Sequence, residues 1–110
     1  MSETERHIVW MGDSLNVLQS FPKPVHADFG SDLRRLQIGE KPIDSRSIKT
    51  EGPDVRELRA RDRNNQYRTM YVAKKGTEIV VLHCFIKKSR TTAKIDINTA
   101  KERLNAFDRN

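Results

Sequence analysis

Residues 66–90 limit how this chain can fold more than any other stretch, because they contain two strand-like segments joined by a short turn. Residues 67–73 are rich in aromatic and β-branched side chains, which suit a pleated, half-buried surface. Residues 78–86 are almost continuously apolar, so we expect them to form a central strand buried on both faces. Residues 74–77 supply the turn, with Gly76 where a positive φ is needed. The stretch therefore predicts a hairpin in the middle of a sheet.

A cluster of cations follows the second strand-like segment directly, at Lys87, Lys88 and Arg90. The whole chain carries a net charge of +6, from 21 Lys and Arg against 15 Asp and Glu. Residues 54–94 alone hold eleven Lys or Arg and four Asp or Glu, a balance of 11 − 4 = +7, so the rest of the chain is nearly neutral. This concentration predicts a basic face, which favours nucleic acid or an acidic protein as partner.

The remaining segments complete one domain, expected to span residues 1–110. Residues 7–11 predict a first strand, and a helix is expected from Asp13 or Ser14 to Phe21. A loop is expected over residues 40–53, which contain prolines, a glycine and small polar residues. Residues 55–61 alternate as a second strand before a turn at 62–65. Two further helices are indicated by apolar stripes, the earlier one ending near Gly39: Val25, Phe29, Leu33 and Leu36; then Ile97, Ala100, Leu104 and Phe107.

This order of elements predicts an α+β fold. Three strands joined by short turns favour a small antiparallel sheet built as a meander. The first two helices are expected to form an N-terminal helical hairpin packed on that sheet, and a C-terminal helix follows the last strand.

Several function classes are disfavoured by what the sequence contains. Cys84 is the single cysteine, so no disulfide is possible within the chain, and we expect it to be a core residue. No Cys or His pair has zinc spacing, and no Gly-rich phosphate loop is present, so no metal or cofactor is expected. No signal-peptide or membrane-spanning run occurs, which predicts a cytoplasmic protein without a membrane partner.

The residue types around the predicted meander suit RNA cleavage without a metal. That reaction needs a base for the 2′-hydroxyl, cations for the charge developing on the phosphate, and an acid for the leaving oxygen. Arginine suits the second task, because its planar fork binds phosphate oxygens in pairs and stays charged. Lys, Tyr or His can serve the other two when burial or neighbours shift their pKa. Tyrosine rings such as Tyr67 and Tyr71 can also stack on a base.

The sequence from Tyr67 to Phe107 resembles the C-terminal half of phage-derived toxins of the RelE/ParE superfamily, of the HigB type. The shared pattern is a Tyr-Arg strand, an apolar strand ending in His83-Cys84-Phe85, and a Lys-Lys-Ser step leading into a helix. Glu57-Leu58-Arg59 also matches the Glu-Leu-Arg strand of that family. The resemblance covers about residues 55–107, roughly half the chain.

This resemblance implies a compact RelE-like fold, similar to microbial ribonucleases, and the toxin role of a type II toxin–antitoxin system. Such toxins are mRNA endoribonucleases (mRNA interferases) that cut translated mRNA on the ribosome without a metal and so inhibit translation. Their partners are mRNA, the ribosome and a cognate helix-turn-helix antitoxin, here HigA-like.

The resemblance also assigns site residues. Arg68 takes the place of the strand arginine that stabilises the phosphate. Lys87 and Lys88 match the basic step, for phosphate binding with one of them in acid–base chemistry. Arg59 matches the arginine of the Glu-Leu-Arg strand. No C-terminal catalytic tyrosine follows the last strand, so the general base stays open.

Two further residues, Tyr71 and His83, are weaker catalytic candidates, since each can equally be a structural core residue. Arg59 has its own structural alternative, an ion pair with Glu57 or Asp62. An RNA footprint is predicted from residues around the meander: Arg61, Arg63, Tyr67 and Arg90. Two alternative functions remain at this stage, a ParE-like toxin that poisons gyrase and a non-catalytic basic phage accessory protein that binds nucleic acid.

Overall fold

The computed structural model describes residues 5–48, 54–74 and 77–109. Its strands are β1 (His7–Trp10), β2 (Ser45–Ile48), β3 (Val55–Arg61), β4 (Gln66–Lys74) and β5 (Glu78–Lys87), and its helices are α1 (Ser14–Ser20), α2 (Lys23–Gln37) and α3 (Lys94–Arg109). The expected turn at 74–77 and the end of the expected loop at 40–53 include residues outside this description. Within it, no helix is both long enough and apolar enough to cross a membrane.

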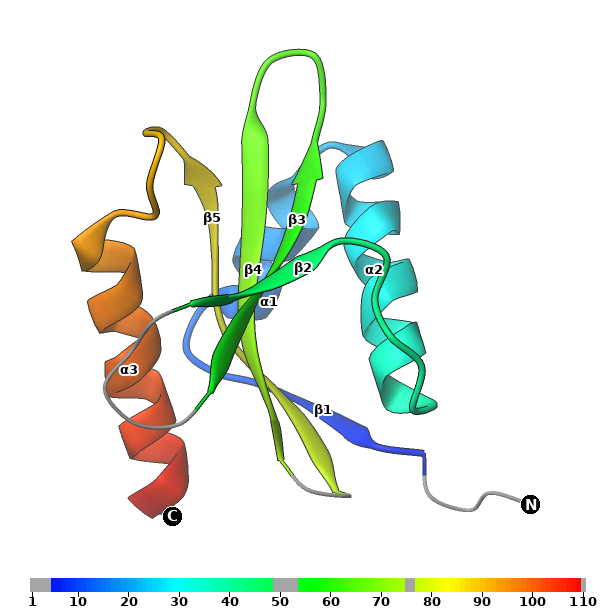
Figure 1. Cartoon of the computed structure of the whole chain (residues 1–110), viewed down its shortest axis with the longest axis vertical. Helices are drawn as coiled ribbons and strands as arrows, with labels where there is room; N and C mark the ends of the chain where they lie inside the picture. Colours follow the sequence, from blue (N-terminus) through cyan, green and yellow to red (C-terminus); the bar gives the residue numbers. More distant parts are fainter. Residues whose placement is uncertain (1–4, 49–53, 75–76, 110) are drawn as a thin grey trace.

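The five strands form one sheet in the order β1-β5-β4-β3-β2 (Figure 1). The meander of β3, β4 and β5 is antiparallel, as predicted. The expectation of a purely antiparallel sheet is wrong, because β1 pairs with β5 in parallel, His7 lying opposite Glu78. A parallel neighbour requires a long crossover, and the chain supplies it through the helices and strands between β1 and β5. The sheet is therefore mixed.

A second correction concerns the expected loop at 40–53, which contains the edge strand β2. This strand is antiparallel to β3, with Arg46 opposite Glu57 and Ile48 opposite Val55. Only Ile48 in it is buried, so the four residues carry too little apolar periodicity to be recognised as a strand. The strand matters for function because it brings Arg46 beside β3.

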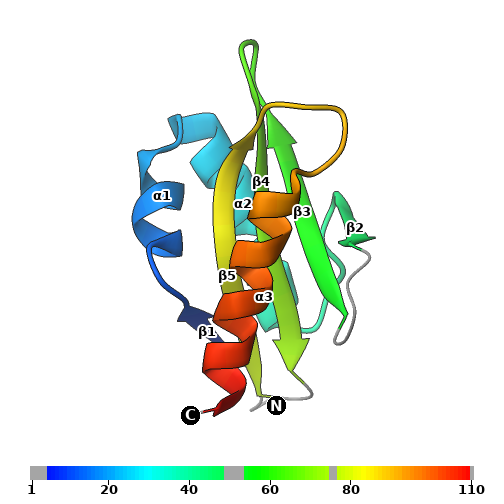
Figure 2. The ribbon, with the colours of Figure 1, turned by 90° about the vertical axis from the view of Figure 1, so that its left-hand side faces the viewer.

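The two sheet faces are covered by different helices (Figures 1 and 2). One face packs on α1 and α2, through the predicted stripe of Val25, Phe29, Leu33 and Leu36. The opposite face packs on α3 through Ala100 and Leu104. Gly39 takes a φ of +84° just after α2, which explains why that helix ends there.

A β-bulge in β5 changes which face its side chains reach. Met70 lies opposite His83 while Tyr71 lies opposite Val81, so Leu82 is an extra residue in the pairing. Val81 faces the core beneath α1 and α2, and strict alternation would send His83 the same way. The bulge turns His83 instead toward α3, where it meets Asp96.

Candidate active site and RNA-binding groove

The ends of three strands meet at one edge of the sheet. The register places Arg61 of β3 opposite Gln66 of β4, and Gln66 opposite Lys87 of β5. Arg59 lies opposite Arg68 one step further in. Because side chains alternate between the two faces of a strand, these cations lie on the face that packs against α3 further along the sheet. Side chains far apart in sequence thus form one basic region.

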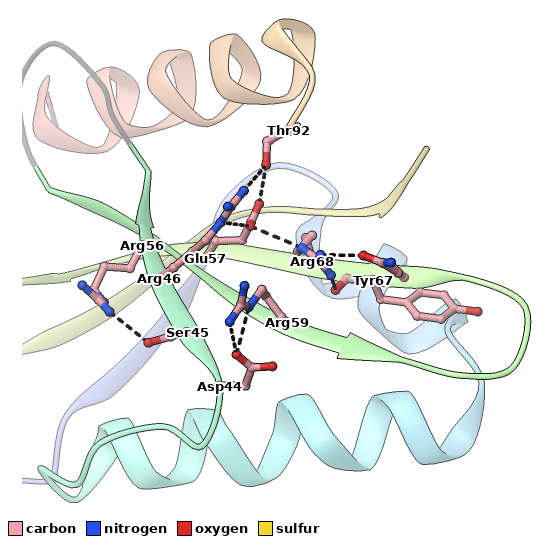
Figure 3. A network of polar contacts seen from close by, with 10 residues as sticks. Asp44, Ser45, Arg46, Arg56, Glu57, Arg59, Tyr67, Arg68 and Thr92 are labelled. Atoms are coloured by element: carbon pink, nitrogen blue, oxygen red, sulfur yellow. Dashed lines mark hydrogen bonds and ion pairs between the residues drawn. The ribbon is translucent and has the colours of Figure 1, made fainter. Parts of the chain in front are cut away.

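A buried carboxylate organises the centre of this region (Figure 3). Glu57 is 0% exposed. Its Oε1 accepts a hydrogen bond from Arg46 Nε at 3.1 Å, and its Oε2 accepts one from the Thr92 hydroxyl at 3.0 Å. Arg68 Nε lies 3.3 Å from Oε1 as an ion pair. A buried charge is tolerated only when it is paired in this way, so Glu57 fixes both arginines in place.

Both terminal nitrogens of the Arg68 guanidinium group donate hydrogen bonds. Nη1 donates to the backbone oxygen of Tyr67 at 2.9 Å, and Nη2 donates to Gln66 Oε1 at 2.8 Å. Burial lowers the pKa of Arg68, while the neighbouring Glu57 carboxylate acts in the opposite direction. Arginine remains charged in proteins, so the side chain is a pre-positioned cation at the border of a groove lined also by Arg59 and Arg61.

Lys87 ends β5 beside this cluster. Partial burial lowers its pKa, and the positive charges of Arg68 and Arg46 lower it further. A lysine shifted in this direction gives up its proton more readily than an ordinary surface lysine. Lys87 is therefore a candidate for the general base, and the charge of the phosphate-binding candidate Arg68 contributes to the lowering of its pKa.

Arg59 has a partner other than the two considered from sequence. Its Nε and Nη2 donate to Asp44 Oδ1 at 2.8 and 2.6 Å. The side chains of Arg59 and Asp44 are 37% and 49% exposed. The pair therefore stays accessible at the rim of the groove that Arg68 borders.

A larger groove lies between the β3–β4 turn and the segment that follows β5. It brings together the RNA-binding candidates Arg61, Arg63 and Arg90 with Lys87 and Lys88. The expected RNA footprint is thus one continuous surface, apart from Tyr67.

Both tyrosines lie on the opposite sheet face. Tyr67 is 3% exposed, and its ring packs against Phe21 with centroids 4.8 Å apart. Tyr71 is buried in the same core cluster, where desolvation raises its pKa. The structure therefore does not bring either ring together with Arg68, and neither ring is available to stack on a base.

His83 lies on the same face as Arg68 but is occupied elsewhere. Its Nε2 is 2.7 Å from Asp96 Oδ1 in the first turn of α3, and its ring stacks on Phe85. It lines neither of the two basic grooves. This placement agrees with the structural alternative for His83.

Arg46 is the residue that sequence reasoning missed, since it lay in an expected loop. The signal was Glu57, which falls between Val55 and Arg59 on one face of a strand. A carboxylate at a position alternating with core residues needs cationic partners. Within the described ranges, no three His, Cys, Asp or Glu side chains are grouped so that they could hold a metal ion.

The fold is that of RelE-like proteins. It is similar to one chain of the crystal structure of the archaeal RelE–RelB complex from Pyrococcus horikoshii OT3, with a TM-score of 0.58 over 79% of this chain and 99% of that chain. The two sequences are 21% identical, so this comparison establishes the fold alone.

The family follows from the sequence itself. The model of the family described as phage-derived protein Gp49-like matches residues 16–105. This chain therefore belongs to the Gp49-like family of phage-derived proteins. None of the curated proteins is a recognisable relative by sequence.

Proposed function

We propose that this protein is the toxin of a type II toxin–antitoxin system and acts as a metal-independent endoribonuclease on translated mRNA. The observation that carries the proposal is the cluster in which buried Glu57 holds Arg46 and Arg68, with Lys87 close enough for their charges to lower its pKa. Fixed cations beside a proton acceptor are what phosphodiester cleavage requires.

The reaction assigned to the cluster is attack by the RNA's own 2′-hydroxyl. Neutral Lys87 takes the 2′-hydroxyl proton, and the 2′-oxygen bonds to the adjacent phosphorus. Arg68, with Arg59 at the groove rim, stabilises the extra negative charge on the phosphate. The bond from phosphorus to the 5′-oxygen breaks, and the leaving oxygen takes a proton from solvent water, while protonated Lys87 later returns its proton to solvent. The products are a 2′,3′-cyclic phosphate and a 5′-hydroxyl end.

Roles outside the cluster follow from position. Lys87, Lys88 and Arg90 all line the larger groove. Partial burial and the charges of Arg68 and Arg46 lower the pKa of Lys87, so we assign proton transfer to Lys87 and RNA binding to Lys88 and Arg90. Tyr71 and His83 take no part, because one is buried on the other face and the other is bound to Asp96. Glu57 and Arg46 act as positioning residues for Arg68.

The partners and location are proposed on the family and the fold. An antitoxin is supported by the similar structure, which is a RelE–RelB complex. We propose a helix-turn-helix, HigA-like antitoxin and a HigB-type toxin, on the resemblance in the strand–cation–helix pattern. Action on the ribosome places the toxin in the cytoplasm.

The test is induced expression in a bacterial host, with growth followed and mRNA 5′ ends mapped by primer extension within minutes. We expect growth arrest and new ends inside translated frames. A variant with both Arg68→Ala and Lys87→Ala should allow normal growth while remaining folded. Arrest with intact mRNA and damaged DNA would replace this function with gyrase poisoning, and harmless expression of folded protein would indicate a non-catalytic binding module.

A further inference from the structure

The larger groove has features that the proposed reaction does not use. We call it the turn groove. It lies between the turn at 62–65, which leads into Gln66 of β4, and residues 88–90, which follow Lys87 of β5 (Figure 1). Gln66 and Lys87 are paired, so the turn and the segment extend from the same end of the sheet. Its volume is about 710 Å³, and its lining is more polar than apolar. Its cationic lining residues are Arg61, Arg63, Lys87, Lys88 and Arg90.

The charge of the turn groove is strongly one-sided. Among the described residues, ten line the groove; five of these are cations, and Asp62 is the one carboxylate. Asp62 is used to build the turn: Oδ1 accepts the backbone N–H groups of Asn64 and Asn65, and Oδ2 accepts the Tyr67 hydroxyl. These contacts, led by the Asn65 N–H, lower the pKa of Asp62.

The groove cations are free to meet a ligand. None of the ion pairs within the described ranges involves Arg61, Arg63, Lys88 or Arg90. A concave surface of unpaired cations attracts a polyanion, and the attraction is independent of sequence.

In the part of the chain that the structure describes, no aromatic side chain lines the turn groove. The nearest tyrosine in sequence, Tyr67, contributes only its hydroxyl to the turn, while its ring is sealed against Phe21. Base stacking is the usual second component of single-strand binding. Its absence from this lining points to recognition of the sugar–phosphate backbone rather than of the bases.

The turn groove is continuous with the reaction cluster. Arg61 and Gln66 line both the turn groove and the smaller groove that Arg68 borders. Gln66 also accepts the hydrogen bond from Arg68 Nη2. An extended strand with one phosphate at Arg68 can therefore run on directly between the two walls of the turn groove.

We propose that the turn groove is a second phosphate-binding site, which holds the backbone of single-stranded RNA next to the bond that is cut. This proposal rests on the proposed function, because it takes RNA as the ligand. The turn groove contributes affinity for RNA. Arg63 on the turn and Arg90 on the opposite segment place a cation on each wall, and together they enclose one strand. The chemical step stays with Arg68 and Lys87.

The test measures binding apart from cleavage. An Arg68→Gln background slows cutting enough for binding to be measured, and binding of a short fluorescent single-stranded RNA is followed by anisotropy over a range of salt concentrations. Adding Arg63→Gln and Arg90→Gln should raise Kd several-fold and reduce the slope of log Kd against log salt by about 1.4, since each single-strand phosphate contact contributes about 0.7.

A matched control variant loses the same number of positive charges as the variant with Arg63→Gln and Arg90→Gln. Arg34→Gln with Arg35→Gln removes two arginines from α2, where they pair with Glu5 and Glu40 at the surface. This control should leave Kd and the salt slope nearly unchanged. Equal effects of the two double variants would overturn the site, and equally tight binding of duplex RNA of the same sequence would overturn the assignment to single strands.

Failure of this inference and failure of the proposed function give different results. If the turn groove binds RNA but the wild-type protein cuts none in cells, the groove stands and the endoribonuclease is wrong. If the wild type cuts mRNA but groove variants bind and cut like it, the reaction stands and the groove proposal is wrong.

Discussion

The reaction cluster and the turn groove are both basic, but their cations are held in opposite ways. In the cluster, Arg46 and Arg68 share the buried Glu57, and Arg59 is bound to Asp44. In the turn groove, Arg63, Lys88 and Arg90 have no ion pair among the described residues. Paired, buried charges are fixed in position at a cost in desolvation, whereas unpaired exposed charges provide long-range attraction. The cluster is thus suited to chemistry and the turn groove to affinity.

The largest difference between the regions should appear when one arginine is removed from each. Arg68→Gln should lower the rate of cleavage of bound RNA by about 10²–10³, the usual effect of losing one donor to a developing anion. Arg63→Gln should leave that rate nearly unchanged once RNA is saturating. Single-turnover kinetics on translating ribosomes measures both, with circular dichroism as the check on folding. Equal losses of rate would erase the distinction between the regions.

The two carboxylates of the cluster, Glu57 and Asp44, allow the stability contribution of a buried ion pair to be compared with that of an exposed one. Glu57→Gln leaves two guanidinium groups facing each other without a buried counter-charge, so the free energy of unfolding should fall by about 3–5 kcal/mol. Asp44→Asn breaks an exposed pair with Arg59 and should cost no more than about 1 kcal/mol. Urea unfolding of both variants gives the comparison, and similar values for the two would show that Glu57 is not the organising group.

The pH dependence of cleavage tests Lys87 as the base. The charge of Arg46 lowers the pKa of Lys87, so Arg46→Gln should raise that pKa. Neutral Lys87 would then appear only at higher pH, and the rising limb of the rate profile should move upward. Arg59→Gln should move it in the same direction by less, because Arg59 contributes less to the shift. A limb unmoved by Arg46→Gln would assign proton transfer to another group.

The smallest effect is expected at Tyr67, at the boundary between the turn groove and the core. Tyr67→Phe removes the hydrogen bond to Asp62 but keeps the ring against Phe21. Thermal unfolding should show a slight loss of stability, and RNA affinity should be unchanged. Weaker RNA binding by a variant that unfolds like the wild type would restore a direct role for this tyrosine.

Much of the fold could be predicted from local patterns. The apolar run in β5 and the alternation in β3 specify the meander, and the spacing of Val25, Phe29 and Leu33 specifies α2. The parallel position of β1 and the pairing of β2 could not be predicted, because local sequence does not determine which edge of the sheet a strand joins or in which direction. The four residues of β2 contain one buried side chain, which is too weak a signal.

The site was predictable where it depended on strand alternation and unpredictable where it depended on tertiary pairing. Alternation places Arg68 and Tyr67 on opposite faces, so stacking by Tyr67 could have been rejected from sequence alone. Predicting the sheet face of His83 required knowledge of the bulge at Leu82, and no residue type in β5 indicates that bulge. Predicting the ion pair between Arg46 and Glu57 required knowledge of the β2–β3 register, which places the two residues opposite each other.

The chemistry of the new RNA ends is the measurement we would make to decide whether the cluster cleaves RNA as proposed. RNA from induced cells is ligated to an adaptor with and without prior treatment by a polynucleotide kinase. Attack by the 2′-hydroxyl predicts 5′-hydroxyl ends, which ligate only after the kinase has added a phosphate, and predicts far fewer of them in the Arg68→Gln variant. New ends that already carry a 5′-phosphate, or ends that are as abundant with folded Arg68→Gln protein as with the wild type, would contradict the reaction assigned to Arg68 and Lys87.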